Sequence, residues 1–126
     1  MRFSVQMGAL FALVFGPVTH GWNATIYDSR NCTGNRYEIY PTAPHTKYFE
    51  MKGSWGAEMV CTFHGRNNST GPCKEQFPVG KSIFSTVGPC RSYSGGHSSG
   101  SHTASQEQGE CKSPDFDILS VVCSDD

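Results

Sequence analysis

Four residues of this chain carry the side chains that acid–base chemistry on a phosphate ester requires. His45 and His64 can exchange a proton near neutral pH, Glu58 can act as a base, and Arg66 can bind a phosphate group. Together they would suit a small secreted ribonuclease-type hydrolase. Their spacing matches no catalytic motif, and the sequence contains no phosphate-binding loop and no HExxH pair. We therefore expect a protein that is not an enzyme, with the hydrolase as an alternative.

The sequence gives little indication of a metal-binding site either. The sequence has no CxxC pair, and His97 and His102 lie in a stretch of small polar residues. Calcium prefers six to eight oxygen ligands, whereas the stretch from Asp117 to Ser120 offers one acid and one hydroxyl. We expect no cofactor and no metal, and we interpret Asp115 and Asp117 as solvated charges.

Six cysteines are the most informative feature of the chain. An even number of thiols in a short exported chain predicts a disulfide framework, and an oxidising compartment favours pairing over metal binding. Six thiols allow 15 pairings, so the sequence leaves the connectivity open. The six are Cys32, Cys61, Cys73, Cys90, Cys111 and Cys123.

The N-terminal residues have the pattern of a signal peptide. Arg2 supplies the positive start, residues 5–18 form an apolar run, and Thr19 to Gly21 offer small residues at the cleavage site. The run is shorter than the roughly 20 residues that cross a bilayer, so no membrane anchor is expected. The interpretation is a signal peptide over residues 1–21 and a secreted, extracellular mature chain.

The mature chain, residues 22–126, has the size of one domain. Without Arg2, nine basic residues face eleven acidic ones, which gives a formal charge of −2. The basic residues are spread singly along the chain, so neither nucleic acid nor an anionic membrane is an expected partner. We expect a monomer that binds an extracellular protein or glycan target.

The sequence contains four Asn-X-Ser/Thr triplets, which are candidate glycosylation sites in an exported protein. In a eukaryotic secretory pathway such asparagines are glycosylation acceptors and lie on the surface. The candidates are Asn23, Asn31, Asn67 and Asn68. The last two are adjacent and can hardly carry two glycans at once.

Local composition predicts short β-strands separated by many turns. Each expected strand is rich in β-branched, aromatic or cysteine residues and is bounded by turn-forming residues. The five strands are expected at Ala24 to Tyr27, Tyr37 to Tyr40, Met59 to Phe63, Ser82 to Val87 and Ile118 to Cys123. This pattern indicates an all-β sandwich or barrel. Helical turns are expected near Lys47 to Lys52 and Gly53 to Glu58.

Residues 92–109 form a Ser/Gly segment with almost no apolar side chain. Such a segment does not bury enough apolar surface to repay the entropy of ordering it, so we expect a flexible loop. The aromatic residues are mostly expected in the core, although a surface row of rings would bind a glycan or a protein. Trp22 is the ring that we expect to be exposed.

One stretch, YDSRNCTGNRYE from Tyr27 to Glu38, resembles the start of a βγ-crystallin Greek-key motif. In that motif an aromatic residue is followed seven residues later by a glycine in a folded hairpin, and then by a second strand. Tyr27, Gly34 and Tyr37 match these positions. Cys32 replaces the second aromatic residue of the family, which implies that a cross-link replaces ring packing. The resemblance implies a small disulfide-stapled Greek-key β-sandwich, like the cysteine-rich fungal effectors and killer-toxin-like proteins of this type.

A second, weaker copy of the motif is suggested by FHGRNNSTG, residues 63–71. On this view residues 22–61 and 62–123 are two related motifs, with Cys61 and Cys123 on corresponding end strands. We expect Cys32 to bond to a cysteine outside its own hairpin, and Cys90 to bond to Cys111 and close the Ser/Gly loop.

Three functions from different classes are compatible with the sequence. The first is a secreted, cysteine-rich, non-enzymatic effector or toxin-like virulence protein that binds a host or competitor target. The second is a protease inhibitor that presents the disulfide-flanked loops Thr62 to Pro72 and Lys74 to Pro89. The third is the ribonuclease-type hydrolase.

Overall fold

The protein is an all-β structure with two antiparallel sheets and three disulfides. A computed structural model describes residues 21–43, 48–52, 58–74, 77–96 and 98–124. The strands are β2 (Asn23–Ser29), β3 (Thr33–Pro41), β4 (Tyr48–Glu50), β5 (Met59–His64), β6 (Thr70–Pro72), β7 (Ser82–Val87), β8 (Cys90–Tyr93), β9 (Cys111–Lys112) and β10 (Ser120–Cys123). The expected signal peptide lies outside the described residues, apart from Gly21.

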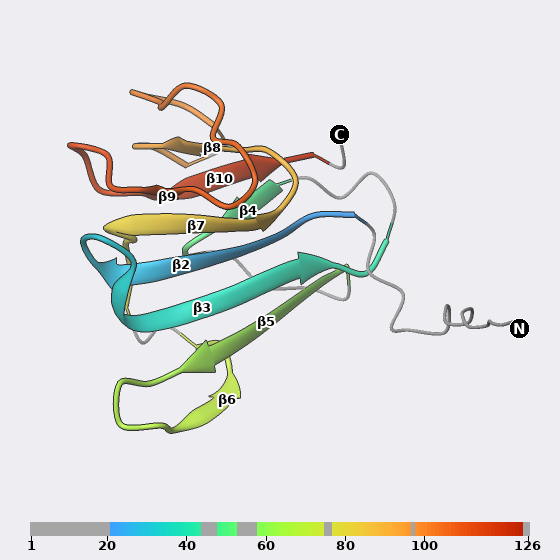
Figure 1. Cartoon of the computed structure of the whole chain (residues 1–126), viewed down its shortest axis with the longest axis vertical. Helices are drawn as coiled ribbons and strands as arrows, with labels where there is room; N and C mark the ends of the chain where they lie inside the picture. Colours follow the sequence, from blue (N-terminus) through green and yellow to red (C-terminus); the bar gives the residue numbers. More distant parts are fainter. Residues whose placement is uncertain (1–20, 44–47, 53–57, 75–76, 97, 125–126) are drawn as a thin grey trace, which may run out of the picture.

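Six strands form the larger sheet, in the order β6-β5-β3-β2-β7-β9, and three form the smaller one, in the order β4-β10-β8. Figure 1 shows the smaller sheet on one side of the larger one. All neighbours pair antiparallel. All five strands that the sequence predicts are present. No described segment forms a helix of the length and hydrophobicity that a membrane span requires.

Side-chain alternation decides which face of the larger sheet is buried. In β3 the side chains of Tyr37, Ile39 and Pro41 are buried, whereas those of Arg36, Glu38 and Tyr40 are only partly buried. Successive side chains of a strand point to opposite faces, so the first three residues line the core. The other three face away from the smaller sheet.

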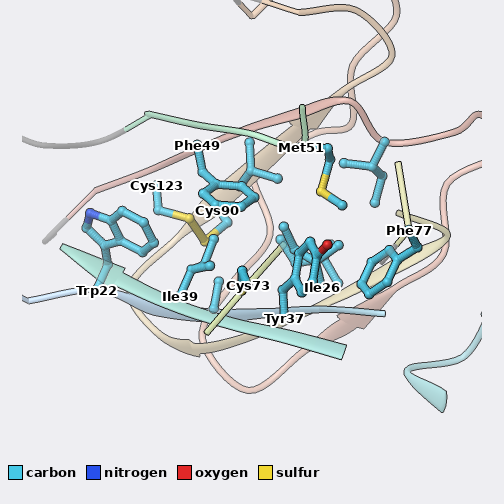
Figure 2. Close-up of a cluster of buried hydrophobic side chains, with 14 residues drawn as sticks. Trp22, Ile26, Tyr37, Ile39, Phe49, Met51, Cys73, Phe77, Cys90 and Cys123 are labelled. Atoms are coloured by element: carbon cyan, nitrogen blue, oxygen red, sulfur yellow. A yellow bond between two sulfur atoms is a disulfide. The ribbon is translucent and has the colours of Figure 1, made fainter. Parts of the chain in front are cut away.

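Both sheets contribute side chains to one hydrophobic core (Figure 2). Tyr37 stacks on Phe77 with ring centroids 4.2 Å apart, and its hydroxyl donates a hydrogen bond to the carbonyl of Lys74. The hydroxyl of this fully buried tyrosine therefore has a partner, as burial requires. The expectation that Trp22 is exposed is wrong: its side chain is 1% exposed, because the start of the chain runs along the core and places Trp22 next to the Cys90–Cys123 disulfide (Figure 2).

The disulfides join Cys32 to Cys111, Cys61 to Cys73, and Cys90 to Cys123, and no cysteine is free. The prediction that Cys32 bonds outside its own hairpin is confirmed. The predicted Cys90–Cys111 bond is wrong. Cys90 faces Cys123 directly in the register of β8 and β10, which leaves Cys111 in β9 to reach the tip of the β2–β3 hairpin.

The helical turn expected near Lys47 to Lys52 is also wrong over its described part. Residues Tyr48–Glu50 form β4, whose residue Phe49 pairs with Val121 of β10. Phe49 is 2% exposed. Its burial in the core therefore overrides the weak local preference of this segment for a helical turn. Most of the other expected turn, residues 53–57, lies outside the described residues.

The Ser/Gly segment runs back along the free edge of β8. Cys90 and Gln106 exchange two backbone hydrogen bonds, and Thr103 donates to the carbonyl of Ser92. The segment therefore covers backbone groups that an edge strand would otherwise expose. The flexibility expected for its middle stays a prediction.

Candidate binding face

The outer face of the larger sheet gathers polar and aromatic side chains from four neighbouring strands. We use "outer face" for the residues that point away from the core here: Tyr27 of β2, Arg36, Glu38 and Tyr40 of β3, Thr62 and His64 of β5, and Thr70 of β6. All except Thr70, which is exposed, are partly buried. The face is thus accessible while its side chains are held by their neighbours.

Strand register places these side chains in rows. Tyr27 pairs with Arg36, Arg36 with His64, and His64 with Thr70, so one row crosses four strands. At the usual strand spacing this row is roughly 14 Å long. Glu38 and Thr62 face each other in the next row. Residues two apart on the same face of a strand are roughly 7 Å apart, so a single ligand can reach both rows.

His64 and Glu38 form the one ion pair or hydrogen bond between side chains of this face that the described residues show. The Nε2 atom of His64 lies 3.0 Å from the Oε1 atom of Glu38. The two residues lie diagonally across β3 and β5. The carboxylate fixes the orientation of the imidazole ring, and it balances the charge of the ring when His64 is protonated.

Arg36 differs from Glu38 in having no partner among the described residues. Its guanidinium forms no hydrogen bond or ion pair with any residue that the structure describes, although its side chain is half-buried. The same holds for the side chains of Tyr27, Tyr40, Thr62 and Thr70. Five side chains of the outer face therefore have unused hydrogen-bonding capacity toward the solvent side.

The residues nominated for ribonuclease chemistry are not brought together. Glu58 precedes β5 and His64 ends it, so six residues of extended chain, roughly 20 Å, separate them. Arg66 points to the β2–β3 hairpin, where its Nη2 atom lies 3.3 Å from Ser29 Oγ. His45 lies outside the described residues. The partner that His64 does have, Glu38, was missed because only strand register reveals it.

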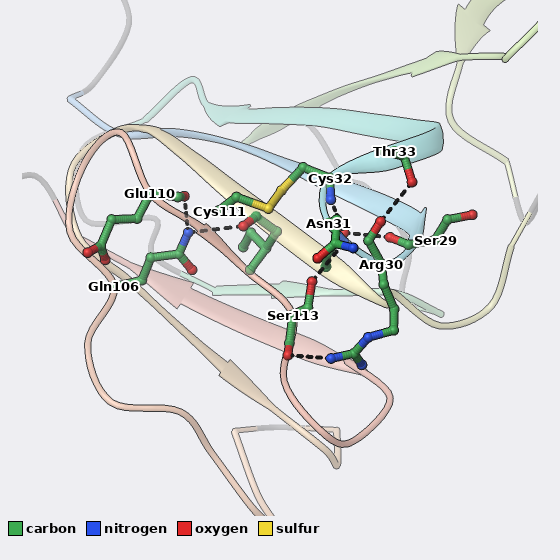
Figure 3. Close-up of a disulfide and its surroundings, with 11 residues drawn as sticks. Ser29, Arg30, Asn31, Cys32, Thr33, Gln106, Glu110, Cys111 and Ser113 are labelled. Carbon is green, nitrogen blue, oxygen red and sulfur yellow. Dashed lines mark hydrogen bonds between the residues drawn. A yellow bond between two sulfur atoms is a disulfide. The ribbon is translucent and has the colours of Figure 1, made fainter.

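A second polar region is the hairpin end, which we define as the loops at residues 29–35, 65–69 and 113–117. Arg30 donates to the carbonyls of Pro114 and Ser113, and the Asn31 amide donates to Ser113 Oγ (Figure 3). Cys32–Cys111 lies beside these bonds. The hairpin tip is thereby held against the loop that follows β9.

Gly34 in this hairpin has a backbone conformation that favours glycine. Its φ is +95°, and a Cβ atom built there would lie 2.3 Å from Asp28 Oδ1 and 2.7 Å from Ser29 Oγ. Asp28 accepts hydrogen bonds from the backbone and side-chain amides of Asn35. Only glycine fits this fold-back without displacing a neighbour.

A groove of about 450 Å³ opens beside the hairpin end. It is lined by Asp28, Ser29, Arg30, Lys81 and residues 114–117. Lys81 Nζ lies 2.5 Å from Asp117 Oδ1, so this acid has a cation as its partner. The described residues contain no group of three metal-ligating side chains.

The two loops nominated for protease inhibition have different structures. In Thr62 to Pro72 the amide of Gly65 donates to the carbonyl of Ser69, and that of Asn68 to the carbonyl of Gly65, which makes a tight turn. In Lys74 to Pro89, residues Ser82–Val87 form β7, which lies between β2 and β9.

The four glycosylation candidates lie in contrasting surroundings. Asn31, Asn67 and Asn68 are exposed at the hairpin end. Asn23 lies in β2, and its Oδ1 atom is buried without a partner among the described residues. Occupancy of these sites stays a prediction.

Comparison with known proteins gives no match: no family model, no curated protein and no solved structure is similar to this chain.

Proposed function

We propose that this is a secreted, non-enzymatic protein that binds an extracellular target of a host or a competitor, in the manner of small cysteine-rich effectors and toxins. The observation that carries the proposal is the outer face: partly buried side chains on rigid strands, five of them without a partner among the described residues. Sites on strands are more precise than sites on loops, which suits recognition.

The disulfides support the extracellular setting. All six cysteines are paired, and three disulfides indicate an oxidising environment. A signal peptide over residues 1–21 would deliver the chain to that environment. We infer that the mature protein acts as a monomer, because its disulfides all close within one chain.

We also infer a βγ-crystallin-like Greek-key architecture. The support comes from the β2–β3 hairpin, where Gly34 has a positive φ and the chain folds back over Asp28. Cys32, which forms a disulfide, stands where the family has an aromatic residue. The pairing of β2 with β3 places Tyr27 and Tyr37 on adjacent strands, as the motif requires.

Hydrolysis is the second candidate, because His64 and Glu38 form an oriented acid–base pair. A hydrolase of RNA would need groups that bind successive phosphates, whereas the outer face offers one unpaired guanidinium. Protease inhibition has less support, since the tight turn at Gly65 to Ser69 does not resemble a substrate strand.

The test uses the mature chain, secreted with its disulfides intact. We expect saturable binding to at least one member of a panel of extracellular glycans and surface proteins, with no cleavage of RNA and no inhibition of proteases. The variant His64→Ala serves as the control for catalysis. RNA cleavage that this variant abolishes, or stoichiometric inhibition of a protease, would refute a non-enzymatic binding role.

A further inference from the structure

We propose that the outer face binds an acidic glycan, with Arg36 as the residue that takes the anionic group of the sugar. The inference rests on the proposed binding function and names its ligand class. Its starting point is the guanidinium of Arg36, which is half-buried and has no partner among the described residues. Arginine pairs with carboxylates and sulfates through two parallel hydrogen bonds. Such an ion pair is stronger at a partly buried site than in water.

The neighbours of Arg36 complete a site for an anion. His64 faces Arg36 in the strand register, and its bond to Glu38 holds the imidazole ring beside the guanidinium. Glu38 already bonds to His64, which keeps its carboxylate from pairing with Arg36. The site therefore has one guanidinium without a partner among the described residues, beside a carboxylate that is bonded to His64.

The rest of the outer face matches the neutral part of a sugar. The hydroxyls of Thr62, Thr70, Tyr27 and Tyr40 have no partner among the described residues, and they can exchange hydrogen bonds with sugar hydroxyls. The ring of Tyr27, which faces Arg36 across β2 and β3, and the ring of Tyr40, four residues further along β3, offer apolar surface. A row of roughly 14 Å suits an oligosaccharide laid across the strands.

A glycan fits these features better than a nucleic acid does. A nucleic acid presents a phosphate at every step and needs several cations in line, and the chain has a net charge of −1. An acidic sugar presents one anionic group surrounded by hydroxyls, which is the pattern of this face.

The experiment measures binding of the mature protein to three immobilised glycans, 3′-sialyllactose with one carboxylate, 3′-sulfolactose with one sulfate, and neutral dextran, and to immobilised single-stranded RNA. The variant Arg36→Gln removes the charge and keeps much of the side chain. Its matched control is Arg91→Gln, because Arg91 is also a half-buried strand arginine without a partner among the described residues, but it lies in β8 of the other sheet. We expect binding to at least one acidic glycan, a loss of tenfold or more in Arg36→Gln, and a change of less than twofold in Arg91→Gln.

A third variant tests the sign of the charge. Glu38→Gln removes the negative charge beside Arg36, so it should strengthen binding of an acidic glycan severalfold. Equal losses in Arg36→Gln and Arg91→Gln, stronger binding to dextran than to either acidic glycan, or stronger binding to RNA would each overturn the inference. Binding to dextran or to a surface protein alone would overturn it and leave the proposed binding function standing. Circular dichroism of each variant checks that its fold is retained.

Discussion

Cys32, at the tip of the β2–β3 hairpin, is bonded to Cys111 in the edge strand β9, 79 residues later in the chain. The bond joins the tip of a hairpin in the middle of the larger sheet to the last strand at its edge. The Cys61–Cys73 bond, by contrast, closes only the β5–β6 hairpin, over 12 residues. The two bonds thus constrain the unfolded chain to very different extents.

The first prediction follows from this difference in loop length. In the chain-entropy treatment, closing 79 residues stabilises the folded state by about 4.5 kcal/mol, and closing 12 residues by about 2.8 kcal/mol. We therefore expect the Cys32→Ser/Cys111→Ser variant to lose more free energy of unfolding than Cys61→Ser/Cys73→Ser. Urea unfolding of both variants measures this. A larger loss in the Cys61/Cys73 variant would mean that native-state effects outweigh loop entropy.

The second prediction concerns Gly34. Gly34→Ala must place a Cβ 2.3 Å from Asp28 Oδ1 at a φ of +95°, so we expect a loss of about 2–3 kcal/mol in the free energy of unfolding. Gly109 serves as a comparison, because it also has a positive φ, +86°, but a Cβ atom added there would meet no other atom within 4 Å. Gly109→Ala therefore isolates backbone strain and should cost about 1 kcal/mol. Gly71→Ala, with open space and no positive φ, should change stability little. Equal losses at all three positions would refute the role of Asp28.

The third prediction concerns Ser82, whose fully buried hydroxyl links β7 to the hairpin tip. Its Oγ atom donates to the carbonyl of Ser29 at 2.5 Å and accepts from the amide of Cys32 at 2.8 Å. Ser82→Ala leaves both backbone groups without this partner, so we expect a loss of about 1–3 kcal/mol in chemical unfolding. Thr86→Ala, at an exposed position of the same strand, is the control and should change stability by less than about 0.5 kcal/mol. A neutral Ser82→Ala would show that water replaces the hydroxyl.

Five strands could be predicted from the sequence because each holds a run of β-branched and aromatic residues between turn-forming residues. The strands that were missed have two to four residues: β4, β6, β8 and β9. Segments as short as Cys111–Lys112 carry no periodicity of their own, and pairing with a neighbouring strand creates them. The buried position of Trp22 has the same origin, since it depends on which sheet the start of the chain joins.

The candidate site was predictable only in part, for a related reason. His64 was recognised by its side chain, but its partner Glu38 lies 26 residues away and becomes a neighbour only through the register of β3 and β5. Arg36 was not singled out, because nothing local distinguishes it from the other scattered basic residues. The Cys90–Cys123 bond likewise depends on the pairing of β8 with β10.

The last prediction concerns Gln106, whose side chain is fully buried and ties the Ser/Gly segment to the larger sheet. Its Nε2 atom donates to the carbonyl of Ile83 at 3.0 Å and to the carbonyl of Glu110. Gln106→Ala removes both bonds and leaves a cavity, so the segment should open more often. We expect faster hydrogen–deuterium exchange of the amides in residues 101–110 and faster proteolysis there, with β7 itself still protected. Ser105→Ala, an exposed neighbour, is the control and should match the unaltered protein. Unchanged exchange in Gln106→Ala would mean that the backbone hydrogen bonds between Cys90 and Gln106 suffice to hold the segment against β8.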